Sequence, residues 1–412
     1  MRTAMASHRR AGALLACAFA CVMLGTTLPT ALYPSYQARF GFGGATVTAV
    51  YAIFAAGILG ALLLVGPASD VIGRKRVLLP GLALAALSSA LFLAVAAMDD
   101  GGLALLLTAR LLSGMSAGIF TGTASATLTD LAGGDRAVQA GLVGAVATLG
   151  GAGLGPLLAG LVAQWGPAPL TTVFAVHLGL LALAAVAVAA IPETVRRTPG
   201  GFSPLWPRVA PPARAAFASA TLAAFAGFAV SGLFVAVTPA LLAELGHHDP
   251  ALTGGIVSAM FAAGAAATIA SARVRTDRAL LAGTALLVVA LAVLLIALGE
   301  RSTGWLIAAA ATAGASQGIG FRAALATVAA ATPVPDRGRA TSAFFAVAYV
   351  GGVSVPVLGV GIAGEQLGLI PAGEAFVAVI ASLAIGALLR LGPEVSAQRL
   401  AATRSRQIAP AP

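Results

Sequence analysis

The chain has 412 residues, of which 59% are hydrophobic and only 9% are charged, and its mean hydropathy is +0.97. A soluble protein carries about 25% charged residues, so the composition excludes a water-soluble fold and predicts an all-α integral membrane protein. The net charge of +10 is also typical of nucleic-acid-binding proteins. Because the basic residues fall in the loops between apolar runs, we expect no nucleic-acid partner.

Runs of about 20 apolar residues, each long enough to cross a bilayer, recur twelve times along the chain. We place these spans near Ala11–Leu32, Thr46–Val65, Val77–Ala97, Gly102–Thr127, Val138–Ala163, Leu170–Ile191, Arg214–Leu242, Leu252–Ala272, Ala279–Leu298, Gly304–Ala330, Ala340–Ala363 and Ala372–Leu391. The first run follows basic residues, as a signal peptide does, but it is long enough to be a retained membrane helix.

The basic residues gather on one side of these spans. With the N-terminus in the cytoplasm, twenty of the 24 Lys and Arg residues fall in cytoplasmic segments, in agreement with the positive-inside rule. We therefore expect a multi-pass protein of the cell (inner) membrane, with both termini cytoplasmic. Arg110 and Arg322 remain inside the spans.

The chain divides into two similar parts. Residues 192–213 are rich in proline and carry three arginines, which predicts a cytoplasmic linker between a bundle over residues 1–191 and a bundle over residues 214–412 that ends in a short tail. The segments that begin at Asp135 and Asp336 share residues at an offset of 200: Ala140, Gly151 and Pro156 match Ala340, Gly351 and Pro356. An internal repeat favours two pseudo-symmetric six-helix bundles; chance similarity of Ala- and Gly-rich helices is the alternative.

A charged turn separates the second and third spans in the stretch GPASDVIGRKRVLLPG, residues 66–81. Gly66 and Gly73 permit a tight turn. Asp70 stands four residues before Arg74, so the two can pair on a helix. The basic residues, including Lys75, hold the turn on the cytoplasmic face.

This turn resembles the signature of the major facilitator superfamily, although Ala68 and Val71 stand where Leu and Arg are common. Three further segments are similar to motifs of the same family, in the same order: RLLSGMSAG (110–118) in the fourth span, GAGLGPLLAG (151–160) in the fifth, and PET (192–194) at the end of the sixth. The fifth-span segment resembles that of drug antiporters. The resemblance covers essentially the whole chain.

The resemblance implies two six-helix bundles that rock about a central site, lined mainly by helices 1, 4, 7 and 10. It also implies a conformational latch built from Gly66, Asp70, Gly73, Arg74 and Lys75. In it Asp70 approaches the start of the eleventh helix near residues 340–342, and Asp130 shares Arg74. The alternative is that the turn only fixes the topology.

Polar residues inside the spans are the candidates for a substrate cavity, because an intramembrane charge is costly and usually faces water or a partner. These candidates are Arg110, Ser113, Ser316, Gln317 and Arg322. Arg110 has an alternative role as a donor to backbone carbonyls of neighbouring helices. Arg322 has an alternative in which its side chain reaches the inner surface.

The fifth span combines packing and bending residues. Gly151 and Gly155 permit close helix contact, and Pro156 favours a kink; we expect a packing role and, by resemblance, a hinge. No Asp or Glu falls in the middle of a span, so His177 in the sixth span is the candidate proton site. A hydrogen-bonded structural histidine is the alternative.

We therefore expect a secondary active transporter of a small molecule that works by alternating access as a monomer. The segment 151–160 favours a proton-coupled exporter, and the alternative is an importer or facilitator of a small, anionic metabolite, because the deep charges are cationic. We expect no enzyme, cofactor or metal site, since no group of nucleophile, base or metal ligands falls within the spans. A sensor or scaffold that transports nothing is a further alternative.

Overall fold

The computed structural model describes residues 2–65, 68–133, 136–195, 206–333 and 336–408. Within these ranges the chain forms helices and turns and contains no β-strand. Ten of the described helical segments are long and apolar enough to cross a membrane. The predicted all-α membrane fold is therefore confirmed.

The first six predicted spans are all helical. The elements are α1 (Arg2–Thr27), η1 (Leu28–Leu32), α2 (Tyr33–Phe40), α3 (Gly44–Leu64), α4 (Ala68–Ile72), α5 (Arg74–Ala96), α6 (Gly102–Ile119), η2 (Phe120–Ala124), α7 (Ser125–Ala132), α8 (Ala137–Trp165) and α9 (Pro169–Ala190). The first span runs past its predicted end at Leu32, because η1 and α2 continue it. It stops at Gly41, whose φ of +68° gives the left-handed conformation that ends a helix.

The last six predicted spans are helical as well. The elements are η4 (Pro211–Ala213), α10 (Arg214–Glu244), α11 (Pro250–Ala270), α12 (Thr276–Gly299), α13 (Thr303–Ala331), α14 (Arg337–Phe345), η6 (Ala346–Ser354), α15 (Val355–Leu367) and α16 (Leu369–Ile408). The tenth and eleventh predicted spans are absent from the ten apolar segments. The tenth is α13, diluted by polar residues such as Gln317 and Arg322, and the eleventh is divided by the π-helical turns of η6.

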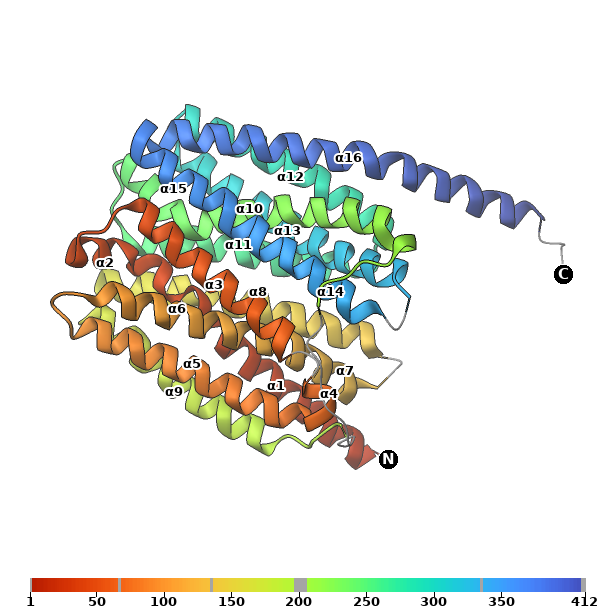
Figure 1. Cartoon of the computed structure of the whole chain (residues 1–412), viewed down its shortest axis with the longest axis horizontal. Coiled ribbons are helices and arrows are strands. Elements are labelled where there is room, and N and C mark those ends of the chain that lie inside the picture. Colours follow the sequence, from red (N-terminus) through yellow and green to blue (C-terminus); the bar gives the residue numbers. More distant parts are fainter. Residues whose placement is uncertain (1, 66–67, 134–135, 196–205, 334–335, 409–412) are drawn as a thin grey trace.

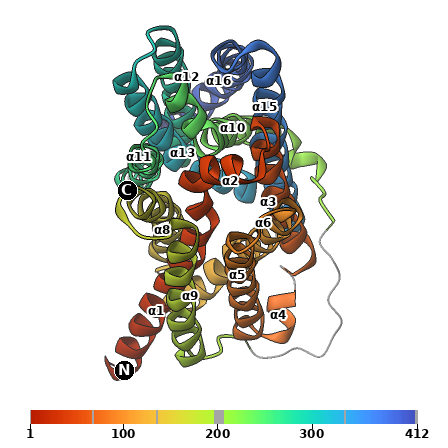
Figure 2. The ribbon, with the colours of Figure 1, turned by 90° about the vertical axis from the view of Figure 1, so that its left-hand side faces the viewer.

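The two halves of the chain lie side by side. The first half (red to yellow) and the second half (green to blue) pack along their lengths, and both chain ends lie at the same end of the molecule (Figure 1). We call this the terminal end; it also carries α4 and the start of α14. The opposite end, which carries α2, is the distal end, and Figure 2 views the molecule from there.

Two seams join the halves. In one, α8 packs against α11; in the other, α3 packs against η6 and α15. Buried apolar side chains form two clusters, and each of them contains residues of both halves. The seams bring segments far apart in sequence together, and the polar groups along them are the candidates for a functional site.

Candidate functional site

The charged turn at the terminal end forms a network around Arg74. Its guanidinium donates from Nε to Asp130 (3.1 Å) and from Nη1 to the Ser69 hydroxyl (2.7 Å), and it forms an ion pair with Asp70. The structure thus brings Asp70 and Asp130 together on Arg74, and the role of these residues as a conformational latch stays a prediction. Thr194 of the predicted linker donates to the same Asp130 carboxylate (3.0 Å), and the other members of this network belong to the first half.

The same turn is tied to the end of α9 by two reciprocal caps. The Glu193 carboxylate accepts the backbone N–H groups of Arg74 (2.9 Å) and Lys75 (3.1 Å), which are free at the start of α5. In return, Lys75 Nζ donates to the carbonyls of Ala189 and Ile191 (3.2 Å for the latter) at the end of α9. A carboxylate at a helix N-terminus and an ammonium at a C-terminus are both favourable. Glu193 stands in the segment PET (192–194), but no local pattern predicted its contact with the charged turn.

Gly73 is required by this arrangement. Its φ is +107°, and a Cβ at this position would lie 2.7 Å from Glu193 Oε2. Gly66 of the predicted latch lies outside the described residues. Asp70 makes no polar contact with α14 among the described residues, and its side chain is 65% exposed. Its predicted approach to residues 340–342 stays a prediction.

At the distal end, polar contacts cross between the halves. The Glu365 carboxylate of α15 accepts the backbone N–H of Ala45 at the start of α3 (2.9 Å). The carboxylate fits because the preceding cap residue is Gly43; a Cβ there would lie 2.2 Å from Glu365 Oε1. A second-half carboxylate therefore caps a first-half helix.

Tyr51 makes the second contact across the distal end. Its hydroxyl bonds to the Thr30 hydroxyl (2.7 Å) and donates to the carbonyl of Val235 in α10 (2.9 Å). Pro239 lies four residues after Val235 and has no N–H, so it leaves this carbonyl without its helical partner. The proline thus frees the acceptor that Tyr51 uses.

Pro156 in α8 acts in the same way between three helices. It leaves the Ala152 carbonyl without a helical partner, and the Thr27 hydroxyl of α1 donates to that carbonyl (2.7 Å). The neighbouring Gly153 carbonyl accepts from the Ser258 hydroxyl of α11, in the other half. The Ala152 and Gly153 carbonyls of α8 therefore bind α1 on one side and α11 on the other.

The predicted packing glycines of α8 lie against α1. A Cβ at Gly151 would lie 2.3 Å from Ala20 O, and a Cβ at Gly155 would lie 2.4 Å from Leu24 O. The structure therefore gives Gly151 and Gly155 a packing position. The hinge assigned to these residues and to Pro156 stays a prediction.

The glycines of the fourth-span motif let α6 pack closely against a helix of the same half, and the second half repeats this contact. A Cβ at Gly114 or Gly118 of α6 would lie 2.1 or 2.5 Å from a backbone oxygen of α3, at Phe54 and Ile58 respectively. In α13, 200 residues later, Gly314 and Gly318 meet backbone oxygens of α11 at 1.8 and 2.0 Å. The serine between each glycine pair donates to a carbonyl of a third helix, α5 for Ser116 (2.7 Å) and α12 for Ser316 (2.9 Å).

Arg110 lies one turn before Gly114 on α6 and is fully buried. Its Nη1 donates to the Thr26 carbonyl in the last turn of α1 (2.7 Å), as the backbone-donor alternative expected. Its guanidinium carbon lies over the rings of Tyr51 (5.0 Å) and Phe54 (4.4 Å). The Nε and Nη2 atoms have no acceptor among the described residues. Ser113, one turn away, is buried too.

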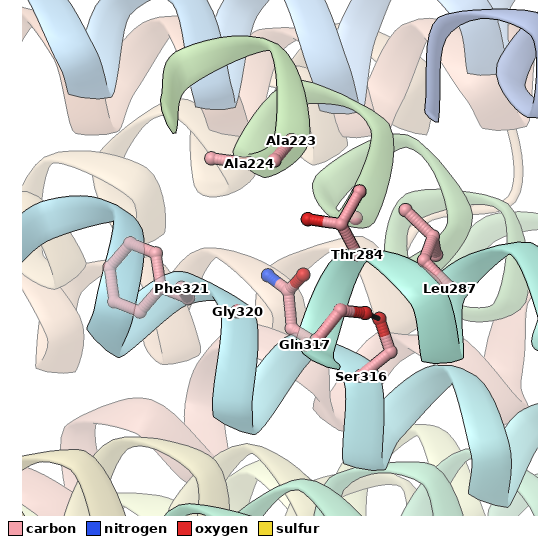
Figure 3. Close-up of a pocket in the computed structure, with 10 residues that line it drawn as sticks. Ala223, Ala224, Thr284, Leu287, Ser316, Gln317, Gly320 and Phe321 are labelled. Atoms are coloured by element: carbon pink, nitrogen blue, oxygen red, sulfur yellow. Dashed lines mark hydrogen bonds between the residues drawn. The ribbon is translucent and has the colours of Figure 1, made fainter. Parts of the chain in front are cut away.

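Ser316 and Gln317 line a small cavity between α10, α12 and α13. In Figure 3 the Gln317 amide points towards α10, beside Thr284. The cavity has a volume of about 10 Å³, which is near the lower limit for one buried water. In this conformation the cavity is too small for a substrate.

Arg322 reaches the end of a neighbouring helix. Its Nη2 donates to the carbonyl of Ser271 (2.7 Å), the residue that caps α11 at the terminal end. Arg322 therefore binds a carbonyl at the C-terminal end of α11, as Lys75 does at the end of α9. This contact favours the alternative in which Arg322 extends towards the surface, and its assignment to a cavity stays a prediction.

His177 is buried between two helices that use both of its nitrogens. Nδ1 lies 2.7 Å from the Ser89 hydroxyl, and Nε2 lies 3.0 Å from the Cys21 carbonyl. Gly25 lets the ring approach, since a Cβ there would lie 2.2 Å from Cε1. A neutral imidazole satisfies both contacts, with Nε2–H donating to Cys21 O. This geometry suits a structural histidine, and the proton role stays a prediction.

The family model described as Major Facilitator Superfamily matches residues 15–298 and 220–411. No match was found among curated protein sequences.

Two solved structures resemble the chain over most of its length. The human organic anion transporter MFSD10 (TETRAN) has a TM-score of 0.65 at 19% identity, covering 93% of this chain and 99% of that one. A bacterial homolog of the human lysosomal transporter Spinster, in an inward-facing and unoccupied conformation, has a TM-score of 0.70 at 14% identity, covering 93% and 97%. Identities this low show a shared fold.

Proposed function

The chain belongs to the Major Facilitator Superfamily of secondary transporters, and we propose that it is a proton-coupled exporter of a small molecule that works by alternating access. In this proposal, residues 1–191 and 214–412 are the two rocking bundles, and the linker is residues 192–213, of which 196–205 lie outside the described residues. The terminal end is cytoplasmic, and the distal end faces outward.

One observation carries the proposal of alternating access. Four hydrogen bonds join the halves among the described residues, and three of them lie at the distal end: Ala45–Glu365, Tyr51–Val235 and Gln164–Asp249. The fourth, Ser258–Gly153, lies in the middle of α8 and α11. At the terminal end, Asp70 pairs with Arg74 and its side chain is largely exposed. In the proposed orientation, these distal contacts support a state closed on the outside.

The sidedness can be tested in cells with a membrane-impermeant maleimide. Asp100→Cys lies in an exposed distal turn and Arg339→Cys on exposed α14 at the terminal end. We expect Asp100→Cys to be labelled in intact cells and Arg339→Cys only after permeabilisation. The reverse pattern would overturn the orientation.

The coupling can be tested with purified protein in liposomes that contain a pH-sensitive dye. Cationic, neutral and anionic compounds are added without an imposed gradient. Release or uptake of protons that depends on the compound supports coupled exchange. Movement of labelled compounds without a pH change would contradict proton coupling, and the absence of any movement would contradict transport.

A second candidate is the import or facilitated passage of a small anion, favoured by Arg110. A buried guanidinium that lacks an acidic partner is an electrostatic cost to the protein, and an anionic substrate would remove that cost. One of the structures that share this fold is described as an organic anion transporter. The same liposome panel separates the candidates by the charge of the compound that moves.

A further inference from the structure

The second half repeats part of the Arg110 motif, without the arginine and without its first serine, Ser113. At an offset of 200, the glycines and the second serine recur as Gly314, Gly318 and Ser316, but the residue that replaces arginine is Ala310. The α11–α13 seam forms around Ala310, which is fully buried. The helix packing therefore does not require an arginine, and its presence in α6 needs a separate explanation.

The guanidinium is held by one nitrogen only. Nη1 caps the last turn of α1 through Thr26, and no Asp or Glu of the described residues pairs with Arg110. Nε and Nη2 are buried and lack an acceptor. They carry three of the five N–H groups of an arginine, so most of the donor capacity of a buried cation is unused.

The unused atoms form one edge of the guanidinium plane. The Nε–H and Nη2–H bonds point in parallel, in the arrangement that binds both oxygens of a carboxylate. The rings of Tyr51 and Phe54 lie over the guanidinium, so the unused donors are those of the buried Nε–Nη2 edge. These aromatic rings would also contact the apolar body of such a ligand.

From this arrangement we infer that Arg110 binds the carboxylate group of the substrate through its Nε–Nη2 edge. The inference rests on the proposed transport function and names its substrate class: small organic acids with an apolar body. The hydroxyl of Tyr51 bonds to Val235 in the other half, so the ring that lies on Arg110 also takes part in the distal contact. Tyr51 therefore links carboxylate binding at Arg110 to the closure of the distal end.

Benzoate is a suitable probe, and benzamide and benzylamine are its neutral and cationic counterparts. The full-length protein in detergent is heated, and the fraction that stays folded is measured by gel filtration over a range of probe concentrations. We expect benzoate to raise the unfolding midpoint in a saturable manner, because a ligand that binds only the folded state stabilises it. Benzamide and benzylamine should leave the midpoint unchanged.

Variants then test the edge of the guanidinium. Arg110→Lys keeps the charge but loses the two parallel donors, and we expect benzoate affinity to fall at least tenfold. Arg110→Gln should abolish the response to benzoate. The matched control is Arg39→Lys, because Arg39 also lies over an aromatic ring (Phe40, 5.9 Å) at the distal end; its benzoate affinity should equal that of the wild type.

The outcomes separate this inference from the proposed transport function. Equal stabilisation by benzoate and benzamide, or unchanged benzoate affinity in Arg110→Lys, would overturn the inference. Where a variant does not fold, the wild-type comparison of benzoate with benzamide decides. If a cation moves in liposomes and benzoate does not bind, transport stands and the carboxylate site fails. If benzoate binds through Arg110 and no compound moves, the site stands and transport fails.

Discussion

At the distal end, Tyr51 and Glu365 make hydrogen bonds from one half of the molecule to the other. At the terminal end, Lys75 binds within the first half, and Glu193 joins that half to the start of the linker. Both ends use the same chemistry, in which charged or hydroxyl groups bind backbone atoms at helix ends or next to proline. The difference lies in which helices are joined. Distal contacts must break when the halves separate there, while the terminal network can stay intact as its half moves.

The comparison can be tested with spin labels that report each end separately. Asp100→Cys and Gln366→Cys place one label in each half at the distal end. Arg76→Cys and Arg339→Cys do so at the terminal end, and all four positions are exposed. The native cysteines are replaced by serine.

The largest effect is expected from Gly254→Val in the α8–α11 seam. A Cβ there would lie 2.2 Å from the Pro156 carbonyl oxygen, so the helices must separate, at a cost of about 1–3 kcal/mol. We expect a longer distal distance and a loss of transport of about tenfold or more. Gly255→Val is the control, because a Cβ at Gly255 meets nothing within 4 Å. Similar effects of the two changes would mean that the α8–α11 contact does not keep the distal end closed.

Gly73→Ala should destabilise the terminal network without moving the distal labels. The change combines a left-handed φ of +107° with a contact to Glu193, which we expect to cost about 1–3 kcal/mol in unfolding free energy. In Gly133→Ala, φ is +77° but nothing lies within 4 Å, so it reports the backbone cost alone. The unfolding midpoint should fall further in Gly73→Ala. A change in the distal distance would show that the two ends are coupled.

Tyr51→Phe removes the hydroxyl that joins Val235 across the distal end. The net contribution of one hydrogen bond to stability is about 1 kcal/mol. We therefore expect the population with a long distal distance to rise about fivefold. Tyr36→Phe is the control, since the buried Tyr36 hydroxyl has no partner among the described residues. An equal response in the two variants would contradict the role given to Tyr51.

Pro239→Ala tests why the Val235 carbonyl is available. It restores an N–H that competes with the Tyr51 hydroxyl for that carbonyl. We expect a rise in the open distal population similar to that of Tyr51→Phe, and no further rise in the double variant. Additive effects would show that the proline acts on another contact.

The smallest effect is expected from Glu365→Gln, which keeps an acceptor for Ala45 N–H but removes the charge. A carboxylate at a helix N-terminus contributes about 0.3–1 kcal/mol, so the open distal population should rise about two- to fivefold. Glu374→Gln, at an exposed position of α16, is the control. An effect that persists at high salt would argue against an electrostatic cause, because salt screens exposed charges.

Much of the fold and part of the site could be predicted from local sequence. Length and hydropathy of the apolar runs located the spans, because a bilayer demands about 20 apolar residues of each helix. The spacing of Asp70 and Arg74 predicted their ion pair, because residues four apart share a helix face. The boundary of the first span was wrong, since a short 3₁₀ turn and a further helix continue it past Leu32.

The tertiary structure alone decided which groups meet. Glu193 lies 120 residues after Gly73 in sequence, and Glu365 lies 320 residues after Ala45, so no local pattern could pair them. Arg110 was visible in the sequence as a buried charge, but its free edge depends on where α1 and α3 lie around it. Apolarity is a property of each segment and can be read along the chain, whereas hydrogen-bond partners are set by the packing of segments distant in sequence.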